Sequence, residues 1–432
     1  MQVSIEDIRN WGIVGAGGAG FPTYVKAGSQ TEKLIINAAE CEPLLYKDKE
    51  ILRNFPNEFF EGIRLMMNLV KAKEGIIAIK EKYGDVIEKI RLNLPSNIRI
   101  HLMGDYYPAG DEFILVFDAT GRIIPPGRLP LDVGCVVDNV ETILNIGRKQ
   151  PVTKKYLTVG GAVKKPSTIC VPIGVSFKEC IDLVGGAAVE NPSIIAGGVM
   201  MGQYCENGDG VVTKTTGGLI VLPYDHPVAR RYRRSSKAIN IIGKSCCDQC
   251  CYCTEYCPRY LLGHPIQPHL VMRSLGLLKK PSETMVIGTL FCCECNLCSL
   301  FACPEDLDPK NICVENKTKL RKMNAKWTSK PSKSHPLIRD RRVPLKRLFA
   351  KLSLKEFENK GPLLDKKTDF KKVRLLLKQG LGAPAEPIVR VGDKVKEGNL
   401  IAKAPRDKLS VPLHSSISGV VRRIDSEIVI ET

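Results

Sequence analysis

Residues 247–258 read CDQCCYCTEYCP, and residues 292–304 read CCECNLCSLFACP. Each stretch holds three cysteines separated by two residues and a further cysteine just before a proline, which is the spacing of bacterial ferredoxins. A tight three-cysteine loop wraps three thiolates around one iron–sulfur cubane, and the distant cysteine ligates the other cubane. The two stretches therefore predict a ferredoxin-like domain with two [4Fe-4S] clusters that moves single electrons.

This spacing predicts crossed ligation, in which each cluster takes three thiolates from one stretch and one from the other. One expected ligand set is Cys247, Cys250, Cys253 and Cys303, and the other is Cys292, Cys295, Cys298 and Cys257. Only the spacing selects the ligand in each cysteine doublet, and it leaves as spare Cys246, Cys251, Cys293 and Cys313. Zinc is the alternative, because paired Cys-x-x-Cys units also build four-thiolate zinc sites.

The other cysteines and the two histidines near the clusters favour structural roles. Five scattered cysteines have no ligand-like spacing and are expected to be small buried hydrophobes, namely Cys41, Cys135, Cys170, Cys180 and Cys205. His264 and His269 follow the first cysteine stretch, and structural hydrogen bonding is the favoured interpretation for both. Apolar residues at helical spacing over 270–278 predict that the cluster domain is mostly helical.

Composition places this domain in a larger chain of 432 residues, which suggests roughly three domains. Its 17 cysteines require a reducing compartment, and residues 1–10 carry no apolar signal-peptide core. No apolar run approaches the ~18 residues of a membrane span. We therefore expect a cytoplasmic protein.

The net charge of +18 suggests a nucleic-acid partner, but the excess is concentrated in one part of the chain. Residues 315–374 hold 20 Lys and Arg against 6 Asp and Glu, without interleaved aromatic residues for base stacking. A solvated basic linker is the favoured interpretation, and a surface for an acidic partner is the alternative. A second basic patch at 230–234 is placed to steer an anionic electron acceptor.

A glycine-rich stretch, GAGGAGFPTYVK at 15–26, carries the other chemical signal. A second apolar run, at 34–36, ends in NAAECEP at 37–43, and Glu40 stands twenty residues after Gly20, as in a dinucleotide-binding fingerprint. The glycine run is longer than that turn needs, so the literal match is weak. The glycines do allow close approach of backbone amides to a phosphate, with Lys26 within reach. Phosphate binding is predicted, and the nucleotide stays open.

These two stretches, with YPAGDE at 107–112, LPLDVG at 129–134 and VDNVET at 137–142, resemble the flavin- and NADH-binding subunit of respiratory complex I. They resemble still more the Rnf complex C subunit and the cobalamin reductase family of propanediol-utilisation microcompartments. The chain departs from complex I at Ala16, Ala27, Ala39 and Asp138, which affects NADH binding more than flavin binding. The resemblance implies FMN and NADH binding by Gly15, Gly17, Gly18, Gly20, Phe21, Lys26, Asn37, Glu40, Glu42, Gly110, Glu112 and Asn139.

Within this set, the resemblance places FMN on the glycine loop, Lys26, Asn37, Glu40 and Asn139, and NADH above it near Phe21 and Glu42. Short strands at 156–163 and 167–172 resemble the β-grasp soluble-ligand-binding (SLBB) domain of the same families, in which Met200 and Met201 favour core packing over a corrinoid site. The end of the chain resembles a barrel-sandwich hybrid without a convincing lipoylation lysine.

The expected architecture is a multidomain α/β and β chain. We expect a Rossmann-like FMN/NADH domain at 1–150, the β-grasp domain at 151–225, a helical two-[4Fe-4S] domain at 226–320, a basic linker at 321–375 and the barrel-sandwich hybrid at 376–432. The order of these modules favours the microcompartment reductase family over the Rnf subunit.

The resemblance implies an NADH-oxidising flavo-iron–sulfur reductase that delivers electrons to cobalamin, inside or beside a bacterial microcompartment whose shell or enzyme proteins are candidate partners. An electron-transfer adaptor that serves a ferredoxin, a flavodoxin or another reductase is the first alternative. A zinc-stabilised nucleic-acid-binding scaffold is the remote one, because zinc does not explain the glycine-rich stretch.

Overall fold

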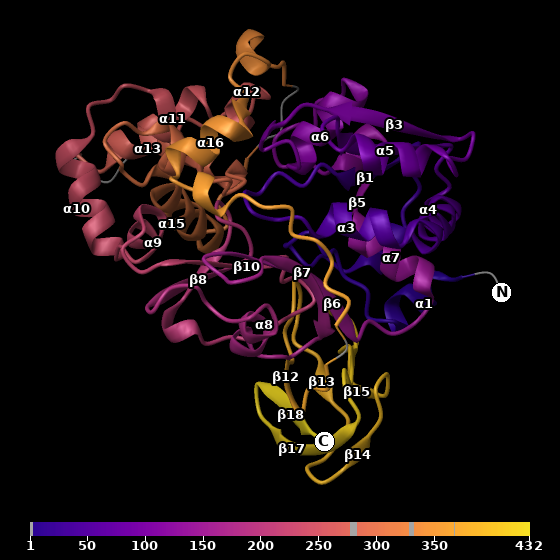
Figure 1. Ribbon diagram of the computed structural model, residues 1–432. Helices are drawn as coiled ribbons and strands as arrows, with labels where there is room; N and C mark the ends of the chain where they lie inside the picture. The colour runs from indigo at the N-terminus through magenta and orange to yellow at the C-terminus, as the bar shows by residue number, and fades with distance from the viewer. Residues whose placement is uncertain (1–2, 277–282, 328–331, 367) are drawn as a thin grey trace.

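The computed structural model describes residues 3–276, 283–327, 332–366 and 368–432. Four units follow one another along the chain, and the second contacts each of the other three (Figure 1). The predicted combination of an α/β unit, a helical cysteine domain and two β modules is confirmed. Among the described helices, none has the length and apolar character that a membrane crossing needs.

The first unit is a parallel sheet covered by helices. Its strand order is β3-β2-β1-β5, with β1 (Lys33–Ala38), β2 (Glu74–Lys80), β3 (Ile98–Met103) and β5 (Cys135–Asn139). The strands are rich in Ile and Val because both faces of a parallel sheet are buried. The other elements are α1 (Ile5–Asn10), α2 (Thr23–Ala27), α3 (Lys47–Asn54), α4 (Pro56–Val70), α5 (Gly84–Arg91), β4 (Tyr106–Tyr107), α6 (Glu112–Thr120), η1 (Pro130–Val133) and α7 (Val140–Arg148).

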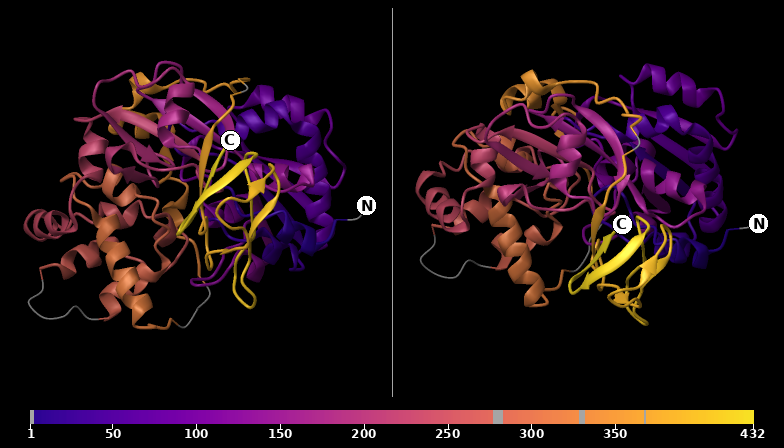
Figure 2. Two further views of the ribbon diagram at one scale, coloured as in Figure 1. Left: turned by 90° about the horizontal axis from the view of Figure 1, so that it is seen from below. Right: turned by 60° about the horizontal axis from the view of Figure 1, so that its bottom comes forward.

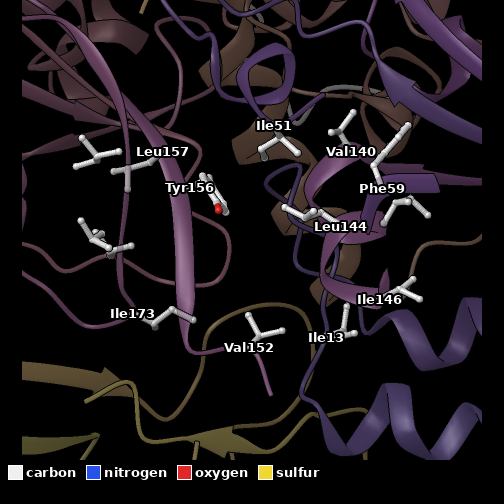
Figure 3. Close-up of a cluster of buried hydrophobic side chains, with 14 of the residues drawn as sticks. Ile13, Ile51, Phe59, Val140, Leu144, Ile146, Val152, Tyr156, Leu157 and Ile173 are labelled. Carbon is white, nitrogen blue, oxygen red and sulfur yellow. The ribbon is translucent and has the colours of Figure 1, made fainter. Parts of the chain in front are cut away.

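The second unit is a mixed five-stranded sheet with the order β7-β6-β10-β8-β9. Its elements are β6 (Lys154–Gly161), β7 (Ser167–Pro172), α8 (Phe177–Leu183), β8 (Pro192–Ala196), β9 (Gln203–Cys205), η2 (Glu206–Gly208) and β10 (Gly218–Pro223). Ser176 caps α8 and exchanges hydrogen bonds with Glu179, which fixes the start of that helix. Tyr156 and Leu157 of β6 share a core with Ile51 and Leu144 of the first unit (Figure 3), so the two units pack as one body.

The third unit carries both cysteine stretches and is mostly helical, as predicted. Its elements are α9 (Pro227–Tyr232), α10 (Ser236–Cys246), α11 (Tyr252–Glu255), α12 (Pro258–Leu261), α13 (Pro268–Ser274), α14 (Glu283–Val286), η3 (Ile287–Phe291), η4 (Cys298–Ala302) and α15 (Pro309–Lys322). Helix α13 covers part of the predicted helical stretch, whose end lies outside the described residues. The cysteines lie on loops and short helices between α10 and α15.

The segment predicted as a solvated basic linker is instead largely folded against the other units. It forms η5 (Pro336–Ile338), β11 (Val343–Pro344), α16 (Leu345–Lys351) and η6 (Lys355–Phe357). β11 pairs with β4, and Leu345, Leu348 and Phe349 of α16 are buried. The prediction failed because the charge excess concealed an amphipathic helix, whose apolar residues recur at helical spacing.

The fourth unit is a small module of two sheets, with the orders β12-β18-β17-β14 and β13-β15-β16. Its strands are β12 (Lys372–Leu376), β13 (Glu386–Pro387), β14 (Lys394–Val395), β15 (Leu400–Lys403), β16 (Leu413–His414), β17 (Gly419–Ile424) and β18 (Glu427–Glu431). Figure 2 shows this module in yellow beside the second unit, where the Arg374 amide donates to the Gly174 carbonyl. The Leu381 amide donates to the Gly20 carbonyl, so the module also touches the glycine loop.

Candidate electron-transfer sites

A first cavity, which we call the outer cavity, is lined by cysteines from both cysteine stretches. The four predicted ligands Cys247, Cys250, Cys253 and Cys303 line it, together with Cys251 and His269. Cys247 and Cys250 are half-buried, and the neighbouring Cys246 is exposed. The Gln249 side-chain amide donates to the Cys247 sulfur at 3.0 Å. This cavity therefore lies close to the molecular surface.

A second cavity, which we call the inner cavity, is also lined by cysteines from both stretches. The other predicted set, Cys257, Cys292, Cys295 and Cys298, lines it, together with Cys293, Cys313 and Asn296. Three of the four predicted ligands are buried and Cys292 is half-buried. The structure therefore brings each predicted set of four thiols into one cavity in the crossed arrangement, while the ligation itself stays a prediction.

The chemistry of these thiols fits a metal cluster. Burial raises the pKa of Cys253 to about 12, so its thiolate needs the positive charge of a metal ion close by. A hydrogen bond with Cys313 lowers the pKa of Cys292 to about 7, against the effect of burial. Four sulfur atoms converging on one enclosed space are the donor set of a [4Fe-4S] cluster.

The spare and scattered cysteines divide into two groups. Three cysteines that the spacing leaves as spare also line the cavities, namely Cys251, Cys293 and Cys313. The spacing alone therefore does not predict every cysteine at the cavity surface. Away from the cavities, Cys135 and Cys180 are buried, Cys170 and Cys205 are half-buried, and Cys41 accepts a hydrogen bond from the Gly110 amide at 3.3 Å. The prediction of small buried residues is therefore confirmed for Cys41, Cys135 and Cys180, while Cys170 and Cys205 are only partly buried.

Both histidines make structural hydrogen bonds. A ring nitrogen of His264 lies 2.9 Å from the Ile124 carbonyl, and the ring packs edge-on against Phe113 and Phe291. His269 borders the outer cavity, but its Nδ1 lies 2.8 Å from the Thr254 hydroxyl. These contacts support the structural interpretation that the sequence favoured.

The glycine loop presents free backbone at the surface of the first unit. Gly17, Gly18 and Ala19 are exposed, and their amides find no protein acceptor within the described parts of the chain. Gly18 has a φ of +117° and open space around it, while Gly15 and Gly20 are held by contacts to Phe21 and Leu381. An unpaired row of amides at such a turn fits a phosphate group.

Lys26 lies at one end of this loop, among carboxylates. Its Nζ donates to the Val137 carbonyl at 2.5 Å and lies 3.4 Å from Asp138 and 3.8 Å from Glu112. Burial alone would lower the pKa of Lys26, but the two carboxylates together raise it. The second carboxylate oxygen of Asp138 is buried and has no partner among the described residues, which suits a donor group on a bound ligand.

The other predicted flavin residues surround the same end of the sheet. Asn37, at the end of β1, donates to the Gly110 carbonyl at 2.8 Å, and the Asn139 side-chain amide donates to Asp48 at 2.7 Å. The Asp48 amide donates to Glu40, whose pKa burial and the neighbouring Asp48 charge raise to about 8. The structure therefore gathers these residues at the carboxyl edge of the parallel strands, where open α/β sheets bind ligands.

The two residues predicted to bind NADH lie in different surroundings. Phe21 is half-buried beside the glycine loop. Glu42 instead accepts hydrogen bonds from the amides of Met200 at 2.8 Å and Met201 at 2.9 Å, across the boundary to the second unit. Burial raises the pKa of Glu42 to about 7. Glu42 is thus engaged in joining two units.

Sequence reasoning missed the residues that join the first unit to the inner cavity. The Tyr107 hydroxyl donates to the Cys295 carbonyl at 2.8 Å, and Arg259 donates two hydrogen bonds to Asp111, at 2.6 and 3.0 Å. The Asn296 side-chain amide donates to the Met200 carbonyl at 3.0 Å. The position of Arg259 two residues after Cys257 was the one available signal, and it does not identify a partner. The basic patch at 230–234 is largely used internally, since Arg231 binds Asp306 and Arg233 binds the Tyr224 carbonyl.

Family models match four parts of the chain. They are the Nuo51 FMN-binding domain at residues 8–148, the SLBB domain at 156–204, the 4Fe-4S dicluster domain at 246–308 and the RnfC barrel sandwich hybrid domain at 353–432. The predicted module order is confirmed, and the iron–sulfur match replaces the zinc alternative.

Curated relatives match over nearly the whole chain. The chain is 42% identical to "Cobalamin reductase PduS" of Salmonella typhimurium over 426 residues, covering 98% of this chain and 94% of the relative. It is 40% identical to the protein of the same name from Citrobacter freundii over 430 residues, covering 99% and 95%. A more distant relative, the C subunit of the Na(+)-translocating ferredoxin:NAD(+) oxidoreductase complex of Acetobacterium woodii, is 35% identical over 265 residues, covering 59% of this chain and 57% of the relative.

Proposed function

The chain belongs to the cobalamin reductase PduS family, and on that premise we propose that it oxidises NADH and delivers single electrons to a corrinoid, cob(III)alamin or cob(II)alamin. FMN and two [4Fe-4S] clusters are the cofactors of this proposal, which places the protein inside or beside a bacterial microcompartment. The observation that carries it is the pair of four-thiol cavities in the same chain as an open glycine loop. In this proposal the FMN/NADH domain ends at residue 150, the β-grasp domain at 225, the cluster domain at 320 and the basic segment at 375.

The chemistry belongs to the cofactors. Bound FMN would supply hydride acceptance from NADH and release of single electrons, and the clusters would supply one-electron transfer. The chain holds and orients these groups. The amides of Gly17, Gly18 and Ala19 bind the flavin phosphate, and Lys26 adds positive charge that Asp138 and Glu112 keep in place.

Asn37, Gly110, Glu40 and Asn139 form the rest of the proposed flavin site. Their mutual hydrogen bonds fix the carboxyl edge of β1 and β5 before any ligand arrives. A site fixed in this way loses little conformational entropy when the flavin binds. The cysteine sets of the two cavities hold the clusters by crossed ligation in this proposal.

An electron-transfer adaptor that takes electrons from another donor is the second candidate. The observation that favours it is the engagement of Glu42, because both carboxylate oxygens are occupied by the Met200 and Met201 amides. An NADH site that depends on Glu42 would have to break these bonds. The adaptor would pass electrons to a ferredoxin, a flavodoxin or another reductase.

Anaerobic visible spectroscopy of the reconstituted protein with FMN separates the two candidates. Addition of NADH should bleach both the flavin and the cluster absorbance, and hydroxocobalamin should then restore them. A protein that binds FMN, is reduced by dithionite and ignores NADH would support the adaptor. Lys26→Met, which removes the charge beside the glycine loop, should weaken FMN binding, while Lys310→Met at the inner cavity should leave FMN binding unchanged.

A further inference from the structure

The two cavities differ in what connects them to the flavin side of the molecule. Within the described residues, the side-chain hydrogen bonds that join residues 106–112 to the cysteine domain end at the inner cavity or at residues beside it. Tyr107 is 1% exposed and its hydroxyl donates to the Cys295 carbonyl. Arg259 pairs with Asp111 and stacks 3.8 Å above the Phe113 ring.

The second unit supplies a further bridge to the same cavity. The loop between β8 and β9 places the Met200 peptide between Glu42 of the first unit and Asn296 of the inner-cavity wall. The Tyr232 hydroxyl lies 2.9 Å from the Val199 carbonyl and 3.2 Å from the Met200 carbonyl, so it donates to the same loop. Gly198 makes this approach possible, because a Cβ there would meet the Glu42 carboxyl carbon at 2.2 Å. Glu42 and Asn296 are thus held at a fixed separation.

We propose that electrons enter the cluster domain at the inner cavity and leave from the outer cavity, and that the Met200 peptide is the positioning element that fixes the inner cluster relative to the flavin. This inference rests on the flavin and cluster sites of the proposed function. Each transfer moves one electron, and one flavin N–H bond breaks over the two transfers. Two transfers return the reduced flavin to its oxidised state, and its proton goes to solvent.

The surface around the outer cavity suits an exit. Cys246 is exposed, Cys247 and Cys250 are half-buried, and Tyr252 is 47% exposed between two of the predicted ligands. No hydrogen bond or ion pair joins these residues to residues 3–148 in the described structure. An acceptor can therefore approach the outer cavity without displacing the first unit.

Flash photoreduction of bound FMN in the reconstituted full chain tests this order without using NADH. Asn296→Ala removes the bond to the Met200 carbonyl, and Gly198→Ala pushes the Met200 loop away from Glu42. Both should slow electron transfer from flavin to clusters by about tenfold or more, because small displacements at a reacting centre are costly. Asn240→Ala deletes a side-chain amide on α10, which is not among the residues that line either cavity, and should leave this rate unchanged.

Two further measurements keep the result interpretable. Tyr232→Phe removes a hydroxyl that hydrogen-bonds to the Met200 loop from outside the cysteine stretches. It should therefore slow electron transfer from flavin to clusters even if Asn296→Ala loses its cluster. Iron content and cluster potentials should stay at their wild-type values in Tyr232→Phe, which a merely unfolded site would not allow. Normal rates in the variants Asn296→Ala, Gly198→Ala and Tyr232→Phe would overturn the proposal. Fast photoreduced transfer without any NADH reaction would instead overturn only the NADH part of the proposed function.

Discussion

The inner and outer cavities come from one repeated cysteine pattern, yet they lie in different surroundings. The inner cavity is enclosed and tied to the first unit through Tyr107 and Arg259, and the buried Lys317 ammonium donates to the Cys292 carbonyl nearby. The outer cavity opens near the exposed Cys246. Identical spacing thus predicts identical metal groups, while the surroundings give each group its own place in an electron path.

Removal of one cysteine from each cavity should give the largest effect and tests the comparison directly. Cys295→Ala should cost most of the cluster iron, because the inner cavity lies at the contact with the first unit and loss of its cluster should loosen that contact as well. Cys250→Ala should cost about half of the roughly eight iron atoms that two clusters contain. Iron and sulfide analysis of the purified variants measures this difference.

Cys246→Ala is the matched control, because Cys246 is exposed and borders neither cavity among the lining residues described. It should retain the full iron content. If Cys250→Ala lost more iron than Cys295→Ala, the outer cavity would be the structural one and the comparison would be reversed.

Two ion pairs next to the cysteine stretches sharpen the comparison at the level of stability. Arg259 is buried at the inner contact, and its partner Asp111 is 12% exposed and keeps its hydrogen bonds to the start of α6, so Arg259→Ala should lower the free energy of unfolding by about 1.5–3 kcal/mol. Arg341 and Glu255 are 32% and 39% exposed, so Arg341→Ala should cost about 1 kcal/mol or less. Urea unfolding of the cluster-loaded protein gives both values, and equal losses would contradict the proposed difference.

The cysteine spacing allowed the cysteines that line each cavity to be predicted, because ligand geometry is a local property of short loops. The helical cysteine domain was predicted from apolar residues at helical spacing, the α/β unit was predicted from the resemblance to flavin-binding families, and both are confirmed. Contacts between distant residues were not predictable. The hydrogen bond between Asn296 and Met200 joins residues 96 positions apart, and no motif near either residue predicts it.

The basic segment was interpreted wrongly for a related reason. Its charge dominates the composition, while the side chains that decide its fold, Leu345, Leu348 and Phe349, are few and find their partners in the other units. Glu42 shows the same limit, because a carboxylate assigned to NADH by resemblance bonds to a backbone loop of the next unit. The partners of the α16 side chains and of Glu42 lie in other units, so they can be identified only in the folded structure.

The pH dependence of stability tests the bridge to the inner cavity through Glu42. Burial raises the pKa of Glu42 from 4.5 to about 7, so the folded state binds a proton more tightly than the unfolded state does. The contribution of this group to the free energy of unfolding should therefore fall by about 3 kcal/mol as the pH rises from 4.5 to 7. Glu42→Gln cannot ionise and should show a flatter profile over that range.

Urea unfolding at several pH values provides the measurement, and the slopes of the two profiles are the quantities compared. Glu6→Gln, at an exposed position on α1, is the control and should keep the slope of the wild type. Parallel profiles for the wild type and Glu42→Gln would contradict a buried, raised Glu42 at the bridge.

The smallest expected effect concerns the reduction potentials of the two clusters. The Gln249 side-chain amide donates to the Cys247 sulfur, and a hydrogen bond to a ligand sulfur favours the reduced, more negative cluster. A neutral hydrogen bond is worth about 0.5–1.5 kcal/mol, so Gln249→Ala should lower the outer potential by about 20–60 mV for one electron. Cys313→Ala removes the hydrogen bond to Cys292 and should lower only the inner potential. Redox titrations followed by electron paramagnetic resonance separate the two clusters, and a shift of the same signal by both variants would show that the cavities do not hold independent clusters.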